Sequence, residues 1–449
     1  MIQLPDSFLQ EMKEQFQSEY KDYLECFNQS RYFGLRVNTS KISVEDFCQI
    51  SPFALTKIPW IENGFYYDGD KVNPAKHPYY HAGLYYLQEP SAMTPANLLP
   101  IEKGDRVLDM CAAPGGKATE IGARLNGSGL LVANDISSSR ARGLLKNIEL
   151  FGIENVLVLS EEPGQLKEEF SHYFDKILID APCSGEGMFR KDNKLIREWL
   201  ERGPKDYMPI QRELLEIGSK LLKPGGTLLY STCTFNKGEN EEAVLDLINK
   251  YPFMKSIEVS KDYEGFTKGN PPLTQARRLY PFKMKGEGHF LALLKKEDSE
   301  KDFNESLPKT TAVKLTPEFT EFLKLIKKDF SRDRFVLRGE RIYYESIAPV
   351  GKKKRVLRNG LYMGEQKKGR FEPSQALAMA LKKEEYPYIL DLKSESIEVI
   401  KYLKGETLLV EGLKEKQFYL VCVDGYPLGF GKYGNNKLKN KYEQGWRMM

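Results

Sequence analysis

Three cysteines of this 449-residue chain each follow an apolar run that ends in a turn-like segment. Cys111 comes directly after the run RVLDM, Cys183 after ILIDAP, and Cys233 after TLLYST. In an open α/β sheet, ligands bind outside the carboxyl ends of the strands. If these runs are neighbouring strands, two thiols and a glycine turn surround one crevice. The sequence therefore predicts thiol chemistry beside a bound cofactor.

The glycine turn is the candidate cofactor site. Gly115 and Gly116 follow a strand and open a helix, and Asp135 ends the next strand. This is the Rossmann arrangement, but the G-x-G of a dinucleotide fingerprint is missing, so a pyrophosphate is not favoured. A helix N-terminus also suits a carboxylate, and S-adenosylmethionine carries one. Asp135 can then accept hydrogen bonds from both ribose hydroxyls, although close helix–strand packing would also explain the two glycines.

The thiols and one carboxylate match the needs of pyrimidine methylation. C5 is a poor nucleophile until a thiolate adds to C6, and afterwards a base must remove the C5 proton so that the thiol can leave. A further group must hydrogen-bond N3 and N4 of the pyrimidine ring. The target nucleobase must also leave the base stack of the nucleic acid to reach the site. Cys233, Asp180 and Cys183 can supply these three roles. The alternative is that each cysteine is a small buried hydrophobic residue.

The pattern around these residues predicts a parallel sheet with helices on both faces. Strands are expected near 106–110, 129–134, 155–159, 175–180 and 226–231, with a closing strand at 288–294. Helices are expected near 116–125, 138–151, 206–222 and 239–250. The preceding residues predict a small α+β unit with helical spacing in 1–30 and short strands at 31–38 and 65–67. The fold class is therefore α/β with a Rossmann-like core.

Composition excludes several classes. Hydrophobic residues make up 41% and charged residues 29%, as in globular proteins, and the length predicts two to four domains. No apolar run approaches the roughly 18 residues of a membrane span, and no signal peptide is visible. The six cysteines form no CxxC pair and have no histidine at zinc spacing, so no metal site is expected. We expect a cytoplasmic protein with reduced thiols and no membrane contact.

Positive charge is concentrated near the C-terminus. Residues 352–370 hold eight Lys/Arg against Glu365, a net +7, and residues 432–447 hold five against Glu443, a net +4. The rest of the chain then carries +4 − 11 = −7. Interleaved aromatic residues make both segments candidates for phosphate contact and base stacking. The alternative is a solvated basic face.

Four motifs resemble the Nol/Nop/Sun family of RNA cytosine-5 methyltransferases. They are CAAPGGK at 111–117, DAPCSGEG at 180–187, STCTF at 231–235 and the Asn240-Glu241 pair. The likeness extends from GLRVNT at 34–39 to GEGHF at 286–290. The C-terminal segments RFEPS (370–374) and LGFGK (428–432) resemble the bacterial ribosomal-RNA subgroup, which acts on 16S RNA and carries a PUA-like RNA-binding module.

The resemblance implies a role for each candidate residue. Cys233 is the nucleophile that attacks C6, Cys183 assists product release, and Asp180 contacts both the cytosine and the methionine end of S-adenosylmethionine. The cofactor site comprises Cys111, Ala112, Ala113, Pro114, Gly115, Gly116, Lys117, Asp135, Arg140, Glu162 and Asp180. Glu162 stands where the family has an aspartate near the adenine, although the local sequence LSEEP departs from that pattern.

The resemblance also sets the expected domains and partners. We expect an RNA-binding leader at 1–75, the Rossmann-like methyltransferase core at 76–296, a linker at 297–310, a first C-terminal segment at 311–370 and a mostly β PUA-like module at 371–449. The expected partner is ribosomal RNA, free or in the assembled small subunit, bound by a monomer. The alternatives are methylation of transfer RNA or DNA, and an RNA-binding ribosome-assembly factor with a vestigial site; the presence of both cysteine motifs favours RNA over DNA.

Overall fold

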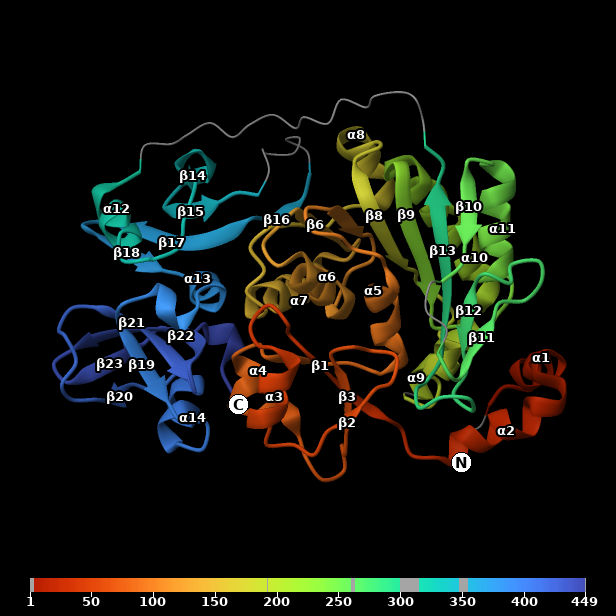
Figure 1. Ribbon diagram of the computed structural model, residues 1–449, viewed down its shortest axis with the longest axis horizontal. Helices are drawn as coiled ribbons and strands as arrows, with labels where there is room; N and C mark the ends of the chain where they lie inside the picture. The colour runs from red at the N-terminus through yellow and green to blue at the C-terminus, as the bar shows by residue number, and fades with distance from the viewer. Residues whose placement is uncertain (1–3, 192, 260–262, 299–314, 347–353, 449) are drawn as a thin grey trace.

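The computed structural model describes residues 4–191, 193–259, 263–298, 315–346 and 354–448 (Figure 1). A ten-stranded sheet forms its centre, in the order β11-β12-β13-β9-β8-β5-β6-β7-β16, with β10 also paired to β13. Neighbouring strands are parallel from β9 to β7. The bounds are β5 Arg106–Asp109, β6 Leu130–Asn134, β7 Val156–Leu159, β8 Phe174–Asp180, β9 Leu222–Thr232, β10 Met254–Ile257, β11 Phe266–Lys268, β12 Arg277–Leu279 and β13 His289–Lys296.

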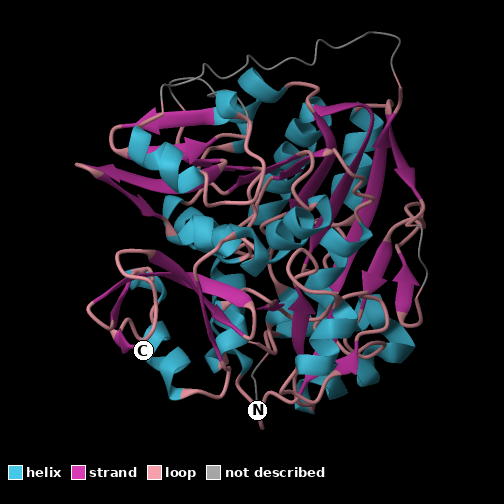
Figure 2. Ribbon diagram, turned by 60° about the vertical axis from the view of Figure 1, so that its left-hand side comes forward, coloured by secondary structure: helices cyan, strands magenta, loops and turns pink. Residues whose placement is uncertain are grey.

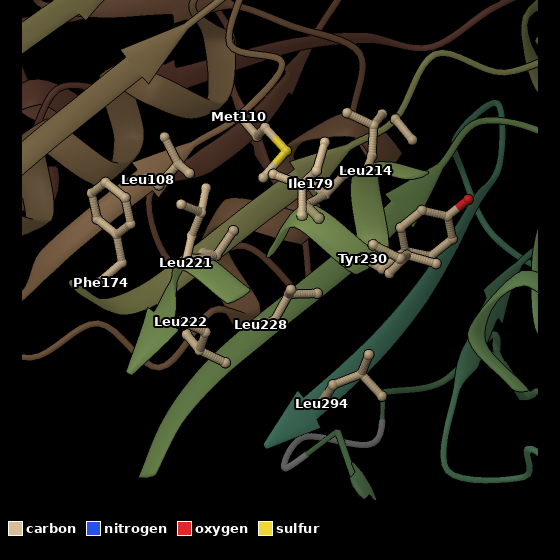
Figure 3. Close-up of a cluster of buried hydrophobic side chains, with 14 of the residues drawn as sticks. Leu108, Met110, Phe174, Ile179, Leu214, Leu221, Leu222, Leu228, Tyr230 and Leu294 are labelled. Atoms are coloured by element: carbon tan, nitrogen blue, oxygen red, sulfur yellow. The ribbon is translucent and has the colours of Figure 1, made fainter. Parts of the chain in front are cut away.

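Helices cover both faces of the central sheet, which confirms the predicted class. Alternate strand residues point to opposite faces, so Leu108 packs with Leu214 of α10 whereas Val107 packs in a second cluster with Ile121 of α6. Figure 3 shows the first cluster, and the turned view in Figure 2 shows helices on either side of the long strands. These helices are α5 Thr94–Leu98, α6 Gly116–Leu125, α7 Ser138–Leu150, α8 Lys167–Phe170, α10 Pro204–Leu221 and α11 Glu241–Lys250, whereas α9 Asn193–Glu201 packs in a cluster with the first helix of the chain.

The N-terminal region forms a separate small sheet in the order β2-β3-β1-β4. Phe8, Met12 and Phe16 of the first helix are buried with Phe189 and Phe235, which belong to the central body. The apolar face predicted for residues 1–30 thus docks beside the loops of the candidate site. The elements are α1 Asp6–Phe16, α2 Tyr20–Glu25, β1 Phe33–Val37, α3 Val44–Ile50, β2 Thr56–Lys57, β3 Gly64–Tyr67, α4 Pro78–His81 and β4 Tyr85–Leu87.

The C-terminal region contains two more sheets, ordered β14-β15-β17-β18 and β19-β21-β22-β23-β20. Of the linker expected at 297–310, residues 299–310 lie outside the described part of the chain. Within the described residues, every helix is too short or too polar to span a bilayer. The elements are α12 Pro317–Leu323, β14 Phe335–Arg338, β15 Arg341–Tyr344, β17 Leu361–Lys367, β18 Arg370–Pro373, α13 Gln375–Ala380, β19 Ile389–Leu392, α14 Ile397–Leu403, β20 Leu408–Leu409, β21 Phe418–Val423, β22 Tyr426–Gly434 and β23 Lys437–Asn440.

One strand from the C-terminal half joins the central sheet. β16 (Val356–Asn359) pairs antiparallel with β7, with Val356 opposite Leu159 and Asn359 opposite Leu157. Ser160 donates its backbone N–H to the Arg355 carbonyl at 3.0 Å, which extends the pairing beyond the strand. The edge of the core sheet is therefore completed by a segment that follows it by almost two hundred residues (356 − 159 = 197).

The charges around this strand differ from the expectation of an open basic patch. Lys354 pairs with Glu168 at 2.7 Å, Arg355 with Glu161 at 3.9 Å and Arg358 with Glu149 at 2.7 Å. Lys352 and Lys353 lie outside the described residues. These acids belong to the central body, so the segment 354–359 is basic because it docks on acidic neighbours. Its cations are therefore paired with carboxylates of the same protein.

Candidate active site

Three adjacent strands deliver the predicted site residues to one edge of the sheet. β5 runs into the loop 111–117, β8 ends at Asp180, and β9 ends just before Cys233. β8 lies between the other two, with Leu178 opposite Asp109 and Asp180 opposite Ser231. Because all three strands are parallel, their carboxyl ends meet, as the sequence predicted.

The two thiols are in contact. Sγ of Cys183 lies 3.3 Å from Sγ of Cys233, and the backbone N–H of Cys233 points at Sγ of Cys183 at 3.4 Å. Both side chains are partly exposed. The contact with Cys233, together with burial, raises the pKa of the Cys183 thiol well above its ordinary value. Cys183 is therefore held as a protonated thiol beside its neighbour.

Asp180 is held as a carboxylate by three groups. Lys117 Nζ lies 2.6 Å from Oδ2, Ser231 Oγ donates to Oδ1 at 2.8 Å, and His289 Nε2 lies 3.4 Å from Oδ1. Burial would raise the pKa of Asp180, but Lys117 and His289 outweigh it and hold the pKa below its ordinary value. The carboxylate lies between the cofactor loop and the thiol loops, where it can contact ligands on both sides.

The loop 111–117 is fastened to Asp135. Ala113 N–H points at Oδ2 of Asp135 at 3.3 Å, and Ser137 N–H donates to Oδ1 at 2.9 Å. Arg140 Nη2 lies 3.5 Å from Oδ2 of Asp135 and donates to the Ala113 carbonyl at 2.8 Å. Gly115 has φ = 114°, a conformation that favours glycine and starts α6 directly after the turn. The structure thus brings together Asp135, Arg140 and the loop.

Asp109 provides a test of which group this loop can hold. It is fully buried, and neither side-chain oxygen has a hydrogen-bond partner among the described residues. Burial raises its pKa to about 8, and the nearby carboxylates of Asp180 and Asp135 contribute. The orphaned carboxyl of Asp109, beside Asp180 and Asp135, leaves acceptor capacity for a ligand's hydrogen-bond donor such as an ammonium. S-adenosylmethionine carries an ammonium and a sulfonium, so the residues present fit it.

Comparison with known proteins agrees with this geometry. Residues 4–90 match the N-terminal domain of 16S rRNA methyltransferase RsmF, and residues 96–295 match 16S rRNA methyltransferase RsmB/F. Residues 321–381 match the RsmF rRNA methyltransferase first C-terminal domain, and 390–448 the methyltransferase RsmF PUA domain. Ribosomal RNA small subunit methyltransferase F of Escherichia coli K12 is 31% identical over 470 residues, covering 98% of this chain and 96% of the relative. The chain belongs to the RsmB/F family of 16S rRNA methyltransferases.

Solved structures support the fold of this RsmB/F member. A methyltransferase homologue from Pyrococcus horikoshii is 29% identical with a TM-score of 0.55, and covers 65% of this chain and 100% of its own. NSun6 from the same organism, solved with SFG, is 24% identical with a TM-score of 0.57, over 66% of this chain and 99% of its own. The family's methyl donor is S-adenosylmethionine, in agreement with the acids around the loop.

Glu161 and Glu162, next to the expected position of the cofactor's adenine, differ in burial. Glu162 is exposed and begins a short 3-10 turn, Pro163–Leu166. Its neighbour Glu161 is buried; its N–H donates to Oδ1 of Asn134 at 2.9 Å, and its carboxylate accepts from the backbone N–H of Arg355. Glu161 is thus occupied in holding the C-terminal strand, and Glu162 remains the predicted contact to adenine.

Two residues that the sequence did not single out for the site belong to it. Arg36 of β1 is buried and donates to the Gly116 carbonyl and to Gln88 Oε1, both at 2.5 Å. His289 starts β13 and reaches Asp180 because β13 pairs with β9. Both lie in segments, GLRVNT and GEGHF, that carried the family resemblance. Their contacts depend on strand neighbours far away in the sequence, which local spacing does not reveal.

Proposed function

We propose that this RsmB/F methyltransferase methylates C5 of cytosine in 16S ribosomal RNA through a covalent adduct on Cys233. The observation that carries the proposal is the 3.3 Å contact between the two thiols, beside an ionised Asp180. One sulfur can bond to C6 while the other stays within reach of the same pyrimidine. A methyltransferase acting on an oxygen or on an exocyclic nitrogen needs no such pair.

The chain's own residues account for the steps at the base. Cys233 Sγ bonds to C6 while its thiol proton passes to N3, which makes C5 nucleophilic, and the Asp180 carboxylate accepts hydrogen bonds from N3–H and from the N4 amino group. S-adenosylmethionine supplies the methyl group that C5 takes up. The C5 proton then leaves to a base, and the C6–S bond breaks to restore the aromatic ring. We assign Cys183 to assist this release, because its sulfur lies 3.3 Å from that of Cys233 and so stays beside the adduct.

The cofactor contacts follow the geometry of the loop. We assign Asp135 to the ribose hydroxyls, Lys117 to ordering of the loop through Asp180, and Arg140 to support of Asp135 and Ala113. Cys111, Ala112, Pro114, Gly115 and Gly116 complete the loop around the methionine end. Glu162 is assigned to the adenine.

The assignment of partners and location follows the same proposal. The substrate is 16S RNA, either free or within the assembled small subunit, and the enzyme acts in the cytoplasm. We expect a monomer, because one chain supplies every group named above. Bisulfite sequencing of 16S RNA from cells with and without the protein tests the cytosine-5 assignment, and its use on free RNA and on assembled subunits distinguishes the two substrates.

Two serine variants test the covalent mechanism. Cys233→Ser should abolish methyl transfer while binding of S-adenosylmethionine survives. Cys183→Ser should allow attack but hinder elimination, so a protein–RNA adduct should accumulate on a denaturing gel. The double variant should show no adduct. Methyl transfer by Cys233→Ser at more than a small fraction of the normal rate would contradict the proposal.

A further inference from the structure

Two buried glutamates lie behind the thiols, one on each thiol-bearing loop. Glu186 follows Cys183 by three residues and is 1% exposed, and Glu239 follows Cys233 by six residues and is fully buried. Neither has a Lys or Arg partner among the described residues. Buried carboxylates are costly unless hydrogen bonds satisfy them, so the bonds they make indicate what they do.

Each glutamate binds the opposite loop. Glu186 Oε2 accepts hydrogen bonds from Thr234 Oγ1 and from Phe235 N–H, both at 2.9 Å. Glu239 Oε2 accepts from Ser184 N–H at 3.0 Å, and its Oε1 accepts from Ser184 Oγ. The bonds therefore cross between the loops in both directions. They end on Ser184, Thr234 and Phe235, which lie within two residues of the cysteines in the chain.

Both glutamates also accept hydrogen bonds from the helices behind the loops. Trp199 Nε1 of α9 donates to Glu186 Oε1 at 3.1 Å. Gln211 Nε2 of α10 donates to Glu239 Oε2 at 2.7 Å and to the Pro182 carbonyl at 2.9 Å. A shift of either loop would leave buried donors and acceptors without hydrogen-bond partners, which costs free energy for each such group.

We propose that Glu186 and Glu239 are positioning residues that form a reciprocal brace between the two loops and hold Cys183 and Cys233 at the separation that a two-thiol reaction needs. The inference rests on the proposed function, because only a reaction that uses both sulfurs requires their spacing to be fixed. The brace itself is a property of the loops and can be measured without RNA.

Phenylarsine oxide measures the thiol spacing directly. Its arsenic forms two As–S bonds with a pair of adjacent thiols, and its oxygen leaves as water with the two thiol protons. The wild-type protein should bind it tightly through Cys183 and Cys233, and Cys183→Ser should lose that binding. Glu186→Gln and Glu239→Gln keep the side-chain shape but turn one acceptor oxygen into an N–H donor. We expect both to bind the arsenical at least roughly tenfold more weakly.

Methyl transfer gives the second readout. In the same glutamine variants, kcat should fall by roughly 100-fold with little change in KM for S-adenosylmethionine, because misplacement of a reacting group by about 1 Å has this effect. Glu345→Gln is the matched control, since Glu345 is buried to the same degree but lies far away in the C-terminal region, against Arg338. It should leave both readouts unchanged.

The outcomes separate the two proposals. If both glutamine variants bind arsenical and methylate RNA like the wild type, the brace is overturned. If arsenical binding falls while kcat is unchanged, thiol spacing does not matter for the reaction, and both the catalytic use of the brace and the two-thiol mechanism are overturned. If a glutamine variant loses S-adenosylmethionine binding through misfolding, Thr234→Val removes one brace hydroxyl without altering either carboxylate, and the same expectations apply with smaller effects.

Discussion

The two basic segments of the C-terminal half look alike in the sequence and differ in the structure. In 354–370, five cations pair with acids: Lys354, Arg355, Arg358, Lys367 and Arg370. In 432–447, Lys441 reaches Glu372 at 3.4 Å, whereas Lys432, Lys437 and Lys439 have no ion pair within the part of the chain that the structure describes. The first segment pairs most of its charge with acids of this protein and leaves the exposed Lys368 without an ion pair among the described residues, whereas the second leaves three lysines without one.

The difference shows why a local charge count misleads. Glu149, Glu161 and Glu168 each pair with one cation of the first segment, from about two hundred residues earlier in the chain. Counting within 352–370 finds one acid, Glu365, and misses these three. RNA binding should therefore depend on the second segment, and stability on the first.

The largest effect should come from removing both segments. Truncation after residue 300 deletes β16, which uncovers β7 and releases Glu161 from Arg355. We expect the core to lose more stability than a single substitution removes, and to bind S-adenosylmethionine at least roughly tenfold more weakly. Calorimetry and thermal unfolding measure these effects. A truncated core with unchanged affinity and melting temperature would show that β16 is dispensable.

An intermediate effect should come from one paired cation. Arg358→Gln leaves Glu149 half-buried without its partner, which should lower the free energy of unfolding by about 3 kcal/mol. Burial already raises the pKa of Glu149 despite Arg358, so the folded state binds this proton more tightly than the unfolded state. Loss of Arg358 should raise this pKa further, so the extra loss of stability should be absent at low pH and should grow as the pH rises above the raised pKa of the wild-type carboxyl. Denaturant unfolding at several pH values measures it, and equal losses at all pH values would contradict the account.

The smallest effect should come from the unpaired lysines. Lys437→Gln combined with Lys439→Gln should leave stability unchanged and weaken binding of a 16S RNA fragment modestly. The slope of log affinity against log salt should flatten by about 1.5, because two phosphate contacts are lost. Lys367→Gln combined with Arg370→Gln is the matched control from the first segment and should leave the slope unchanged. Equal slopes in both double variants would remove the distinction between the segments.

Much of the core was predictable because its strands are buried apolar runs. The expected strands at 106–110 and 175–180 correspond to Arg106–Asp109 and Phe174–Asp180, and the expected helix at 116–125 to Gly116–Leu125. Such runs have few alternative conformations, and the parallel order then brings Asp180 and both cysteines together. The shared crevice of the two thiols followed from the strand ends, but their 3.3 Å contact is known only from the structure.

The parts that the sequence could not predict depend on partners from elsewhere in the chain. β16 is only four residues long and lies among lysines and arginines, so its pattern is that of a solvated loop. Its pairing with β7 depends on the acids of the core. In the sequence, Glu186 and Glu239 have the pattern of loop residues. Only the folded structure shows that each glutamate hydrogen-bonds the opposite loop.

The late strand β16 also sets an order of events during synthesis. A ribosome makes β7 long before it makes Val356–Asn359, so the growing chain carries an unpaired sheet edge throughout that interval. Such edges invite pairing with other chains, which makes this interval the vulnerable stage of folding. A prematurely terminated product that contains every motif of the active site would still lack its closing strand. The sheet of the catalytic domain is therefore complete only after residues 356–359 have been synthesised.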